Sequence, residues 1–572
     1  MPQMIPLPKN RRFVASDLRI NSWNDLQPYF DSLLNQSLNS SVELESWLLQ
    51  RSELESVLDE DLAWRYIRMT CDTTHEAHRE AYHFFINEIF PQLAPYDDRL
   101  NRHMLESPAI DSLQSPEFLL YRRKVEAAIR LYRDENVPLQ QQMKKLESDY
   151  GACIGAMGIS YKGQEYTMPQ AAQLLKSADR AEREQVWVLM MQRRQQDEDR
   201  LNNLFSELIS LRHQIAQNAG FESYTQYRFL ELGRFDYNEQ DCFDFHEAIR
   251  SLVVPVKARF DADRARALGL PKLQPWDTKA EPPGREPLKP FANEAELIER
   301  SIAAFGELDA YFGDCLYSMD KMGHFDLSSR KGKAPGGYNY PLMESGAPFI
   351  FMNAAGSMED LETMMHEGGH AVHSFLSKDL PLAAYKVLPS ETAELASMSM
   401  ELMSMSQYNK FFEDEASIKR ARYEQIQRAI SVLPWIACID AFQHWLYQHP
   451  DHSVVERKAK WLALFDAYGS PEVDWSGLDK LAGMQWQAQL HLFEVPFYYI
   501  EYGFAQLGAI GIWKQFVENR QQALEHYKKA LSLGNTRSIP KVYEAAGLRF
   551  EFGKAYLSDL LDFTKAQLDR LD

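Results

Sequence analysis

The chain has 572 residues, of which 45% are hydrophobic and 25% are charged, as in ordinary globular proteins. A length of about 150 residues per domain predicts roughly two to four domains. The formal net charge of -20 at pH 7 argues against nucleic-acid binding through a broad basic surface, because phosphate backbones are themselves negative. We therefore expect no nucleic-acid partner.

The five cysteines lie far apart and form no CxxC pair. This pattern predicts neither a disulfide framework nor a zinc site built from thiolates. The N-terminal segment has no apolar stretch of signal-peptide length, and no run of about 18 apolar residues occurs in the chain. We therefore expect no membrane span and a cytoplasmic location.

Helical periodicity dominates from the N-terminus onward. Apolar residues recur at spacings of three and four in segments 39–70, 118–148, 170–218 and 417–447. The pattern predicts a mainly α protein with one or two small strand elements. The proline-rich stretch 266–291 predicts a surface connection, because proline removes amide donors. Gly336 and Gly337 predict a turn, and the short apolar run 349–352 after it predicts a strand.

The segment His366-Glu-Gly-Gly-His370 matches the pattern H-E-x-x-H. Residues i and i+4 share one face of a helix, so both imidazoles can reach one zinc ion. Glu367 projects about 100° round the helix, where it can hold a water molecule and take its proton.

The flanks of this motif predict the helix that it needs. Ser357 is a plausible N-cap and acidic residues follow it. Gly368 and Gly369 are poor helix formers. Two glycines in a row suggest that another backbone packs closely there, as a second helix carrying a metal ligand would.

A zinc hydrolase needs a third protein ligand and one open position. A histidine ten residues after the first is excluded, because that place is Leu376, and we interpret His373 as a packing residue. A second helix, capped by Ser390, would bring Glu391 and Glu394 within reach. Spacing alone does not choose between these two acids.

At this point the sequence resembles the oligoendopeptidase F and thimet oligopeptidase family of gluzincin-type zinc metallopeptidases. The stretches that carry the resemblance are Asp360–His370, Ala393–Ser397 with Glu401, His491 with Phe497–Tyr502, and Leu533–Pro540. Members of the thimet type have a further tyrosine at the place of Ala505. The chain is therefore more similar to the oligoendopeptidase F branch.

The resemblance implies roles for these residues. It makes Glu394 the third metal ligand and Glu391 a neighbour. Glu401 would orient a ligand histidine by accepting the proton of its other ring nitrogen, although a solvated helix acid is an equal alternative.

It also implies that His491, Tyr498 and Tyr502 donate hydrogen bonds to substrate or to the tetrahedral oxyanion. Tyr499 competes with Tyr498 for this role. An aromatic packing helix is the plainer alternative for this cluster.

The fold that the resemblance implies is a helical ellipsoid of two lobes around a deep substrate channel, with a small β-sheet beside the zinc helix. Residues 1–200 would form a helical N-terminal region in the channel wall, and residues 201–572 the catalytic domain. The Gly336–Tyr338 loop and the run 349–352 would be the substrate-lining loop and the edge strand.

We therefore expect a zinc-dependent oligoendopeptidase of the EC 3.4.24 type that hydrolyses short peptides and holds one zinc ion per chain. Two alternatives remain at this stage. One is a peptide-binding protein that kept the metal but lost turnover. The other is a zinc hydrolase that acts on a non-peptide amide.

Overall fold

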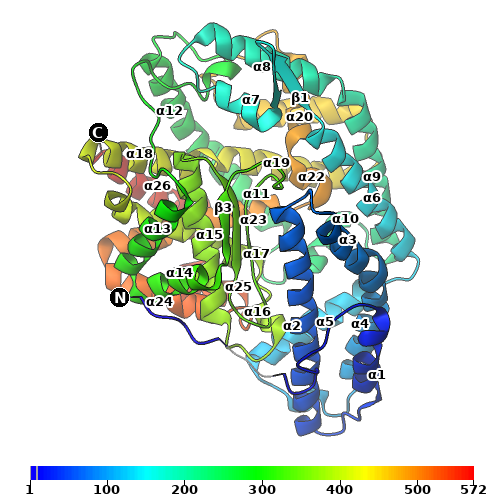
Figure 1. Cartoon of the computed structure of the whole chain (residues 1–572). Helices are drawn as coiled ribbons and strands as arrows, with labels where there is room; N and C mark the ends of the chain where they lie inside the picture. Colours follow the sequence, from blue (N-terminus) through cyan, green and yellow to red (C-terminus); the bar gives the residue numbers. More distant parts are fainter. Residues whose placement is uncertain (1, 8–10, 572) are drawn as a thin grey trace.

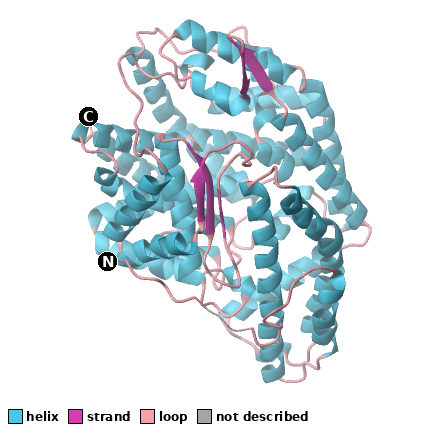
Figure 2. Cartoon of the chain, in the orientation of Figure 1, coloured by secondary structure: helices cyan, strands magenta, loops and turns pink. Residues whose placement is uncertain are grey.

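Helices form most of the polypeptide in this computed structural model, which describes residues 2–7 and 11–571 (Figures 1 and 2). The described residues form two small sheets, which lie among the helices. The mainly α prediction is therefore confirmed.

The α-helices of the first half follow one another closely along the chain. They are α1 (Gln27–Asn35), α2 (Ser41–Cys71), α3 (Glu76–Phe84), α4 (Phe90–Leu105), α5 (Pro116–Leu131), α6 (Asn136–Gly155), α7 (Met168–Leu174), α8 (Arg180–Gln195), α9 (Glu198–Asn218), α10 (Tyr224–Glu231), α11 (Glu239–Ala248), α12 (Val254–Ala267), α13 (Glu294–Leu308) and α14 (Ala310–Met322).

The α-helices of the second half include those that carry the predicted site. They are α15 (Met358–Ser377), α16 (Ala383–Lys386), α17 (Ser390–Ser404), α18 (Glu415–Ser431), α19 (Leu433–Gln448), α20 (Val454–Tyr468), α21 (Asp479–Ala482), α22 (Leu490–Glu494), α23 (Tyr499–Glu518), α24 (Arg520–Ser532), α25 (Ile539–Ala545) and α26 (Lys554–Leu568).

Prolines and caps divide the longest predicted segments. Segment 118–148 contains the break between α5 and α6, and segment 170–218 contains most of α7 and all of α8 and α9. Segment 417–447 is divided by Pro434 in the first turn of α19, where a proline is tolerated because its missing N–H has no helical partner. Apolar spacing thus identified helical segments but not their ends.

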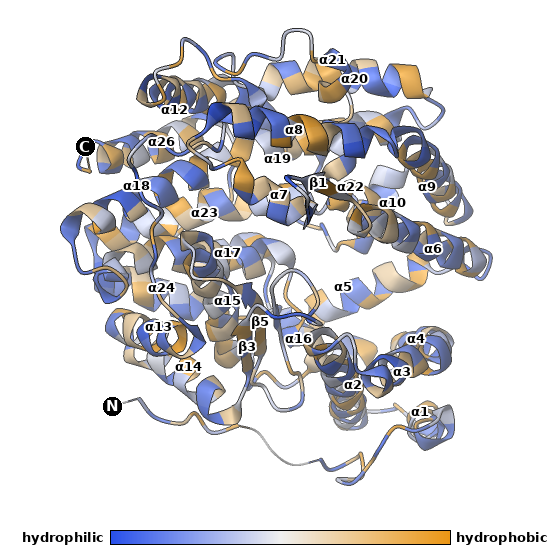
Figure 3. Cartoon of the chain, turned by 45° about the horizontal axis from the view of Figure 1, so that its top comes forward, coloured by the Kyte–Doolittle hydropathy of each residue, from blue (hydrophilic) through white to orange (hydrophobic). Residues whose placement is uncertain are grey.

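The described residues form two large hydrophobic cores that follow the order of the chain, and a third, small cluster joins α2 to the larger sheet. The smaller core joins buried residues of segments 14–125 with Leu382 and Tyr385. The larger core runs from Tyr150 to Leu568 and surrounds the predicted zinc helix. Many helices show a polar and an apolar side along their length (Figure 3), as helices do when one face is buried. The predicted domain boundary at residue 200 stays a prediction.

The larger sheet lies directly beside the predicted zinc helix. Its strands are β3 (Phe325–Ser328), β4 (Tyr338–Tyr340) and β5 (Phe349–Ala354), in the order β3-β5-β4. Strand β5 pairs parallel with β3 and antiparallel with β4, so it is the central strand. The expectation that residues 349–352 form the edge strand is wrong: the edge that contacts the motif helix through Asn339 is β4, and the connection 341–348 returns the chain from β4 to the central strand β5.

The smaller sheet is a hairpin of β1 (Gly158–Tyr161) and β2 (Gln164–Thr167) in the N-terminal half.

The proline-rich connection 266–291 is more deeply buried than its composition predicts. Asp277 is fully buried there, and its carboxylate accepts hydrogen bonds from Arg183 and Arg180. The expectation of a surface connection therefore holds for only part of this segment.

One helical stretch, 415–448, is long and apolar enough by composition to span a membrane. It comprises α18 and α19, and 72% of its most apolar window is buried inside the protein. Its apolar residues thus pack in the larger core.

Candidate metal centre and active site

The helix α15 begins at the predicted position. The Asp360 amide donates to Ser357 Oγ at 3.2 Å, and the Asp360 carboxylate accepts from the Ser357 amide at 2.8 Å. This reciprocal capping box satisfies two amides that the helix leaves free. It fixes the start of α15, and hence the face on which His366 and His370 lie.

Gly369 permits the close approach of a second helix. A Cβ atom built on Gly369 would lie 2.6 Å from the Ser397 Cα and 2.9 Å from the Ala396 carbonyl oxygen, both on α17. A Cβ on Gly368 would lie 2.5 Å from Phe305 of α13. The predicted close packing of a backbone against this pair is therefore confirmed for Gly369.

Replacing Gly369 with alanine should destabilise the protein, because the obstructing atoms belong to a backbone that cannot move without displacing α17. We expect a loss of about 1–3 kcal/mol in the free energy of unfolding, the usual cost of overpacking. Thermal unfolding measures it. Gly155→Ala is the matched control, because no atom lies within 4 Å of a Cβ at that helical position. Equal stability of the two variants would contradict this interpretation.

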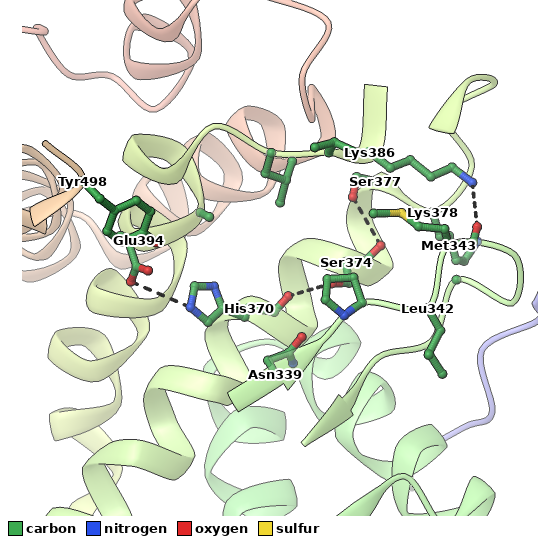
Figure 4. A pocket seen from close by; sticks show the side chains of 15 residues that line it. Asn339, Leu342, Met343, His370, Ser374, Ser377, Lys378, Lys386, Glu394 and Tyr498 are labelled. Atoms are coloured by element: carbon green, nitrogen blue, oxygen red, sulfur yellow. Dashed lines mark hydrogen bonds and ion pairs between the residues drawn. The ribbon is translucent and has the colours of Figure 1, made fainter. Parts of the chain in front are cut away.

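The helix α17 carries the acid that faces both histidines. Glu394 Oε2 lies 3.3 Å from His366 Nε2 and 3.8 Å from His370 Nε2. One ligand atom from each of the three residues lies within 4.8 Å of the other two (Figure 4 shows His370 and Glu394). Ser397 Oγ donates to Glu394 Oε2 at 3.1 Å and fixes the carboxylate.

The start of α17 differs from the prediction. Pro389 is the N-cap residue and Ser390 is the first residue of the helix, so Ser390 does not cap it. The chain before α17 is held instead from the C-terminal segment: Asn535 Nδ2 donates to the Val387 carbonyl at 2.7 Å, and the Asn535 amide donates to the Tyr385 carbonyl at 2.7 Å. The segment Leu533–Pro540 thus helps to position Glu394.

The two remaining acids have distinct places. Glu391 is buried and accepts a hydrogen bond of 2.6 Å from the Tyr237 hydroxyl, away from the two histidines. Glu401 Oε1 lies 2.7 Å from His366 Nδ1, and Gln425 Nε2 donates to Glu401 Oε2 at 2.8 Å. A carboxylate on Nδ1 leaves Nε2 of His366 free as the ligand atom.

The donor set fits zinc. Two imidazole nitrogens and one carboxylate oxygen are ligands that zinc takes in hydrolytic sites, with a fourth position left for water or substrate. The carboxylate on the far nitrogen of His366 is the arrangement that orients such ligands. His366, His370 and Glu394 are therefore able to hold the ion that the resemblance implies.

Glu367 lies beside this centre on the next position of α15. Its side chain is buried, and burial raises the pKa of its carboxyl to about 7. A carboxyl group with a pKa near the working pH can both accept and return a proton. Asn339 of β4 donates to the Glu367 backbone carbonyl at 3.1 Å, so the strand and the helix are joined at this residue.

His491 and the tyrosines come from the short helix α22 and the start of the long helix α23. His491 lies on α22, Tyr498 is the N-cap residue of α23, and Tyr502 lies within α23. The His491 ring centre lies 6.0 Å from that of Tyr498 and 5.9 Å from that of Tyr502. The structure therefore brings these residues together although Pro496 separates their helices. The Tyr499 ring is closer to His491, at 4.7 Å, but Tyr498 lines the cavity described below.

A hydrogen-bond chain fixes the tautomer of His491. Trp435 Nε1 donates to Gln489 Oε1 at 2.8 Å, which leaves Gln489 Nε2 to donate to His491 Nδ1 at 2.7 Å. Burial lowers the pKa of His491 to about 4. The imidazole is therefore neutral, with its proton on Nε2, and can act as a hydrogen-bond donor from that atom.

The turn before Tyr498 has an uncommon backbone. Phe497 has a φ of 65°, in the left-handed region that side chains other than glycine rarely adopt. Its amide donates to Gln443 Oε1 at 2.5 Å, and its carbonyl accepts from Arg234, which also donates to Glu501 Oε1 at 2.7 Å. These contacts hold the backbone of Phe497 in place, and this backbone determines where the Tyr498 side chain points.

A cavity of about 330 Å³ opens beside the metal centre. His370, Glu394 and Tyr498 line it together with Asn339 of β4 and, farther from the metal centre, Lys386 (Figure 4). Two of the predicted metal ligands and the edge strand β4 thus border the same cavity. A channel that continues through the molecule stays a prediction.

Comparisons with known proteins identify the family of this chain. The model of peptidase family M3 matches residues 173–560, more than half of the chain, and the model of the peptidase M3 N-terminal domain matches residues 16–132. The chain belongs to peptidase family M3.

Individual relatives point to one branch of this family. An oligoendopeptidase F homolog of Borreliella burgdorferi is 25% identical over 287 residues, which are 49% of this chain and 47% of the relative. The oligopeptidase PepF of Bacillus subtilis is 24% identical over 233 residues, which are 39% of this chain and 33% of that protein. The matched region thus spans less than half the length of these relatives.

A solved structure of PZ peptidase A with an inhibitor has a TM-score of 0.89 and 26% identity, and it covers 98% of this chain and 100% of its own. The resemblance to oligoendopeptidase F is therefore confirmed. Its implications for the individual site residues stay predictions.

Proposed function

We propose that the protein is a zinc-dependent endopeptidase that hydrolyses short peptides. The observation that carries this proposal is the convergence of His366, His370 and Glu394 beside a cavity that His370, Glu394 and Tyr498 line. Family membership supports a peptidase that acts on oligopeptides. Zinc, bound by these three residues, would supply a Lewis acid that polarises the scissile carbonyl and lowers the pKa of water.

The protein's own groups supply the proton transfers and the hydrogen bonds. Glu367 takes the proton of the attacking water and passes it to the leaving amine, a role that fits a pKa near 7. His491 donates from Nε2 to the oxygen on which negative charge develops, and Tyr498 and Tyr502 donate their hydroxyl protons. Neutral donors that are already oriented need no rearrangement during the reaction.

The edge strand supports peptides over other amides as substrates. Strand β4 pairs with β5 on one side only, and Asn339 of β4 lines the cavity. An extended peptide can add to such an edge through its main chain, whereas a small amide cannot. This favours a peptidase over a hydrolase of non-peptide amides.

Cleavage of internally quenched peptides of graded length tests the proposal. We expect short peptides to be cut at internal bonds, folded proteins to resist, and a chelator to abolish turnover that added zinc restores. Mass spectrometry of the products separates internal cleavage from removal of terminal residues. A folded, zinc-loaded protein that cuts none of the peptides would contradict the proposal and favour a peptide-binding protein.

A further inference from the structure

Four metal-ligating side chains meet in the interior between α11 and α19. Cys242 and His246 lie four residues apart on α11, and Asp440 and His444 lie four residues apart on α19. All four are buried: Cys242 and Asp440 are fully inaccessible, and His444 and His246 are 2% and 6% exposed. The two residues of each pair share one face of their helix. The face of α11 that carries one pair is turned toward the face of α19 that carries the other.

The donor atoms have the spacing of a metal site. One ligand atom each from Cys242, Asp440 and His444 lies within 4.8 Å of the other two, as at the predicted catalytic centre. His444 Nε2 lies 3.3 Å from Asp440 Oδ2, the distance that also separates His366 Nε2 from Glu394 Oε2. His246 Nε2 lies 2.8 Å from the same Asp440 oxygen and offers a fourth donor.

Two of these atoms are poorly satisfied among the described residues. Asp440 Oδ1 is buried without a hydrogen-bond partner, and the contact of His444 Nε2 is the 3.3 Å ion-pair contact with Asp440 Oδ2. Buried polar atoms without partners are costly and call for an explanation. Meanwhile His444 Nδ1 lies 3.2 Å from Glu239 Oε2, so a carboxylate orients this imidazole as Glu401 orients His366.

The charge of the buried Asp440 carboxylate is consistent with a cation at this place. The Asp440 carboxylate is fully buried, and its ion-pair partners among the described residues are the two imidazoles of His246 and His444. No lysine or arginine of the described chain lies within ion-pair distance of it. A buried carboxylate needs positive charge nearby, which either a protonated histidine or a metal ion provides.

We propose that Cys242, Asp440 and His444, with His246 as the fourth ligand, bind a second, structural zinc ion. A thiolate with two imidazoles and one carboxylate selects zinc over magnesium or calcium, and four protein ligands leave no open position for catalysis. This site is independent of the proposed peptidase function.

The position of the site gives the ion a structural role. Gln443, which accepts the hydrogen bond from the Phe497 amide, lies next to His444 on α19. The His444 ring centre is 5.1 Å from that of Phe497. An ion that joins α11 to α19 would therefore brace the turn that directs Tyr498 toward the predicted catalytic centre.

Metal analysis of the purified, zinc-saturated full chain tests the proposal. We expect two zinc ions per chain in the wild type and one in the double variant His366→Ala, His370→Ala. Cys242→Ser should also hold one ion, whereas Cys438→Ser, a buried cysteine on α19 outside the cluster, should hold two. A single ion in the wild type that the double variant loses would overturn the proposal. A single ion that the double variant keeps would support this site and count against the catalytic one.

Cobalt substitution provides a second measurement, whose decisive result comes from the wild type and so does not depend on how well the variants fold. Only the proposed structural site contains a thiolate, so cobalt-loaded wild type should show a thiolate-to-cobalt charge-transfer band. The double histidine variant should keep this band. A cobalt-saturated wild type without it would overturn the assignment of Cys242 as a ligand.

Discussion

Glu367→Gln should lower kcat by about 10²- to 10⁴-fold while the protein keeps its zinc. The amide has nearly the same shape as the carboxylate but cannot accept the proton of the attacking water, so the loss equals the usual contribution of a general base. Glu367 is not among the residues that converge as metal ligands. Steady-state kinetics on a quenched peptide, together with zinc analysis of the same sample, measures both effects.

The matched control for this variant is Glu359→Gln. Glu359 lies on the same helix, but its carboxylate pairs with Lys176 at 3.0 Å and is not part of the metal centre. We expect kcat within about twofold of the wild-type value, because the Glu359 carboxylate is not part of the metal centre and the loss of such an ion pair affects mainly stability, by less than about 1 kcal/mol. Wild-type turnover in Glu367→Gln would refute the proposed mechanism.

Glu394→Ala should remove the metal from the catalytic centre. Mutation of a residue that only orients a metal ligand typically weakens metal affinity by about 10- to 100-fold. Loss of a ligand itself should weaken the affinity by more than this. The remaining pair, His366 and His370, leaves a centre with too few protein ligands for a hydrolytic zinc site. Competition with a chromophoric chelator gives the affinity.

Glu391→Ala is the control that separates the two acids. Because the Glu391 carboxylate accepts from the Tyr237 hydroxyl and not from the metal centre, this variant should keep wild-type zinc affinity, although it loses a buried hydrogen bond. Circular dichroism confirms that both variants are folded. If Glu391→Ala strips the zinc and Glu394→Ala does not, the ligand assignment is wrong.

The part of the site that the sequence predicted is governed by local rules. The spacing of His366 and His370 and the cap at Ser357 both act within one helix, and helical geometry determines their result. The pair Gly368-Gly369 was informative for a similar reason: a residue without a side chain in a helix marks a close neighbour, and α17 is that neighbour. Choosing Glu394 over Glu391 required the resemblance.

The remaining features depend on contacts between distant segments. The apolar run 349–352 predicts a strand, but which strands flank it depends on β3 and β4, so its central place was not predictable from its own residues. Gln489 and Gln425 carry no motif, and only the fold shows that they hold His491 and Glu401. The left-handed conformation of Phe497 likewise follows from tertiary contacts, because phenylalanine does not favour it.

The buried cluster of α11 and α19 shows where spacing could have helped. Both pairs, Cys242 with His246 and Asp440 with His444, have the same four-residue spacing as the H-E-x-x-H motif. Each pair alone is a weak signal, and 194 residues separate His246 from Asp440. The scattered cysteines argued against a zinc site built from several thiolates. A site that combines one thiolate with imidazoles and a carboxylate needs only one cysteine, so this argument does not apply to it.

The three-residue length of β4 limits what can attach to the sheet. A free strand edge offers main-chain N–H and C=O groups. A peptide that binds there must be extended and must have free main-chain groups of its own, whereas its side chains matter less. An exposed edge is also a starting point for aggregation, and proteins counter this by keeping edge strands short. Three residues provide a few main-chain hydrogen bonds for a transient ligand but too few to hold a second copy of the chain.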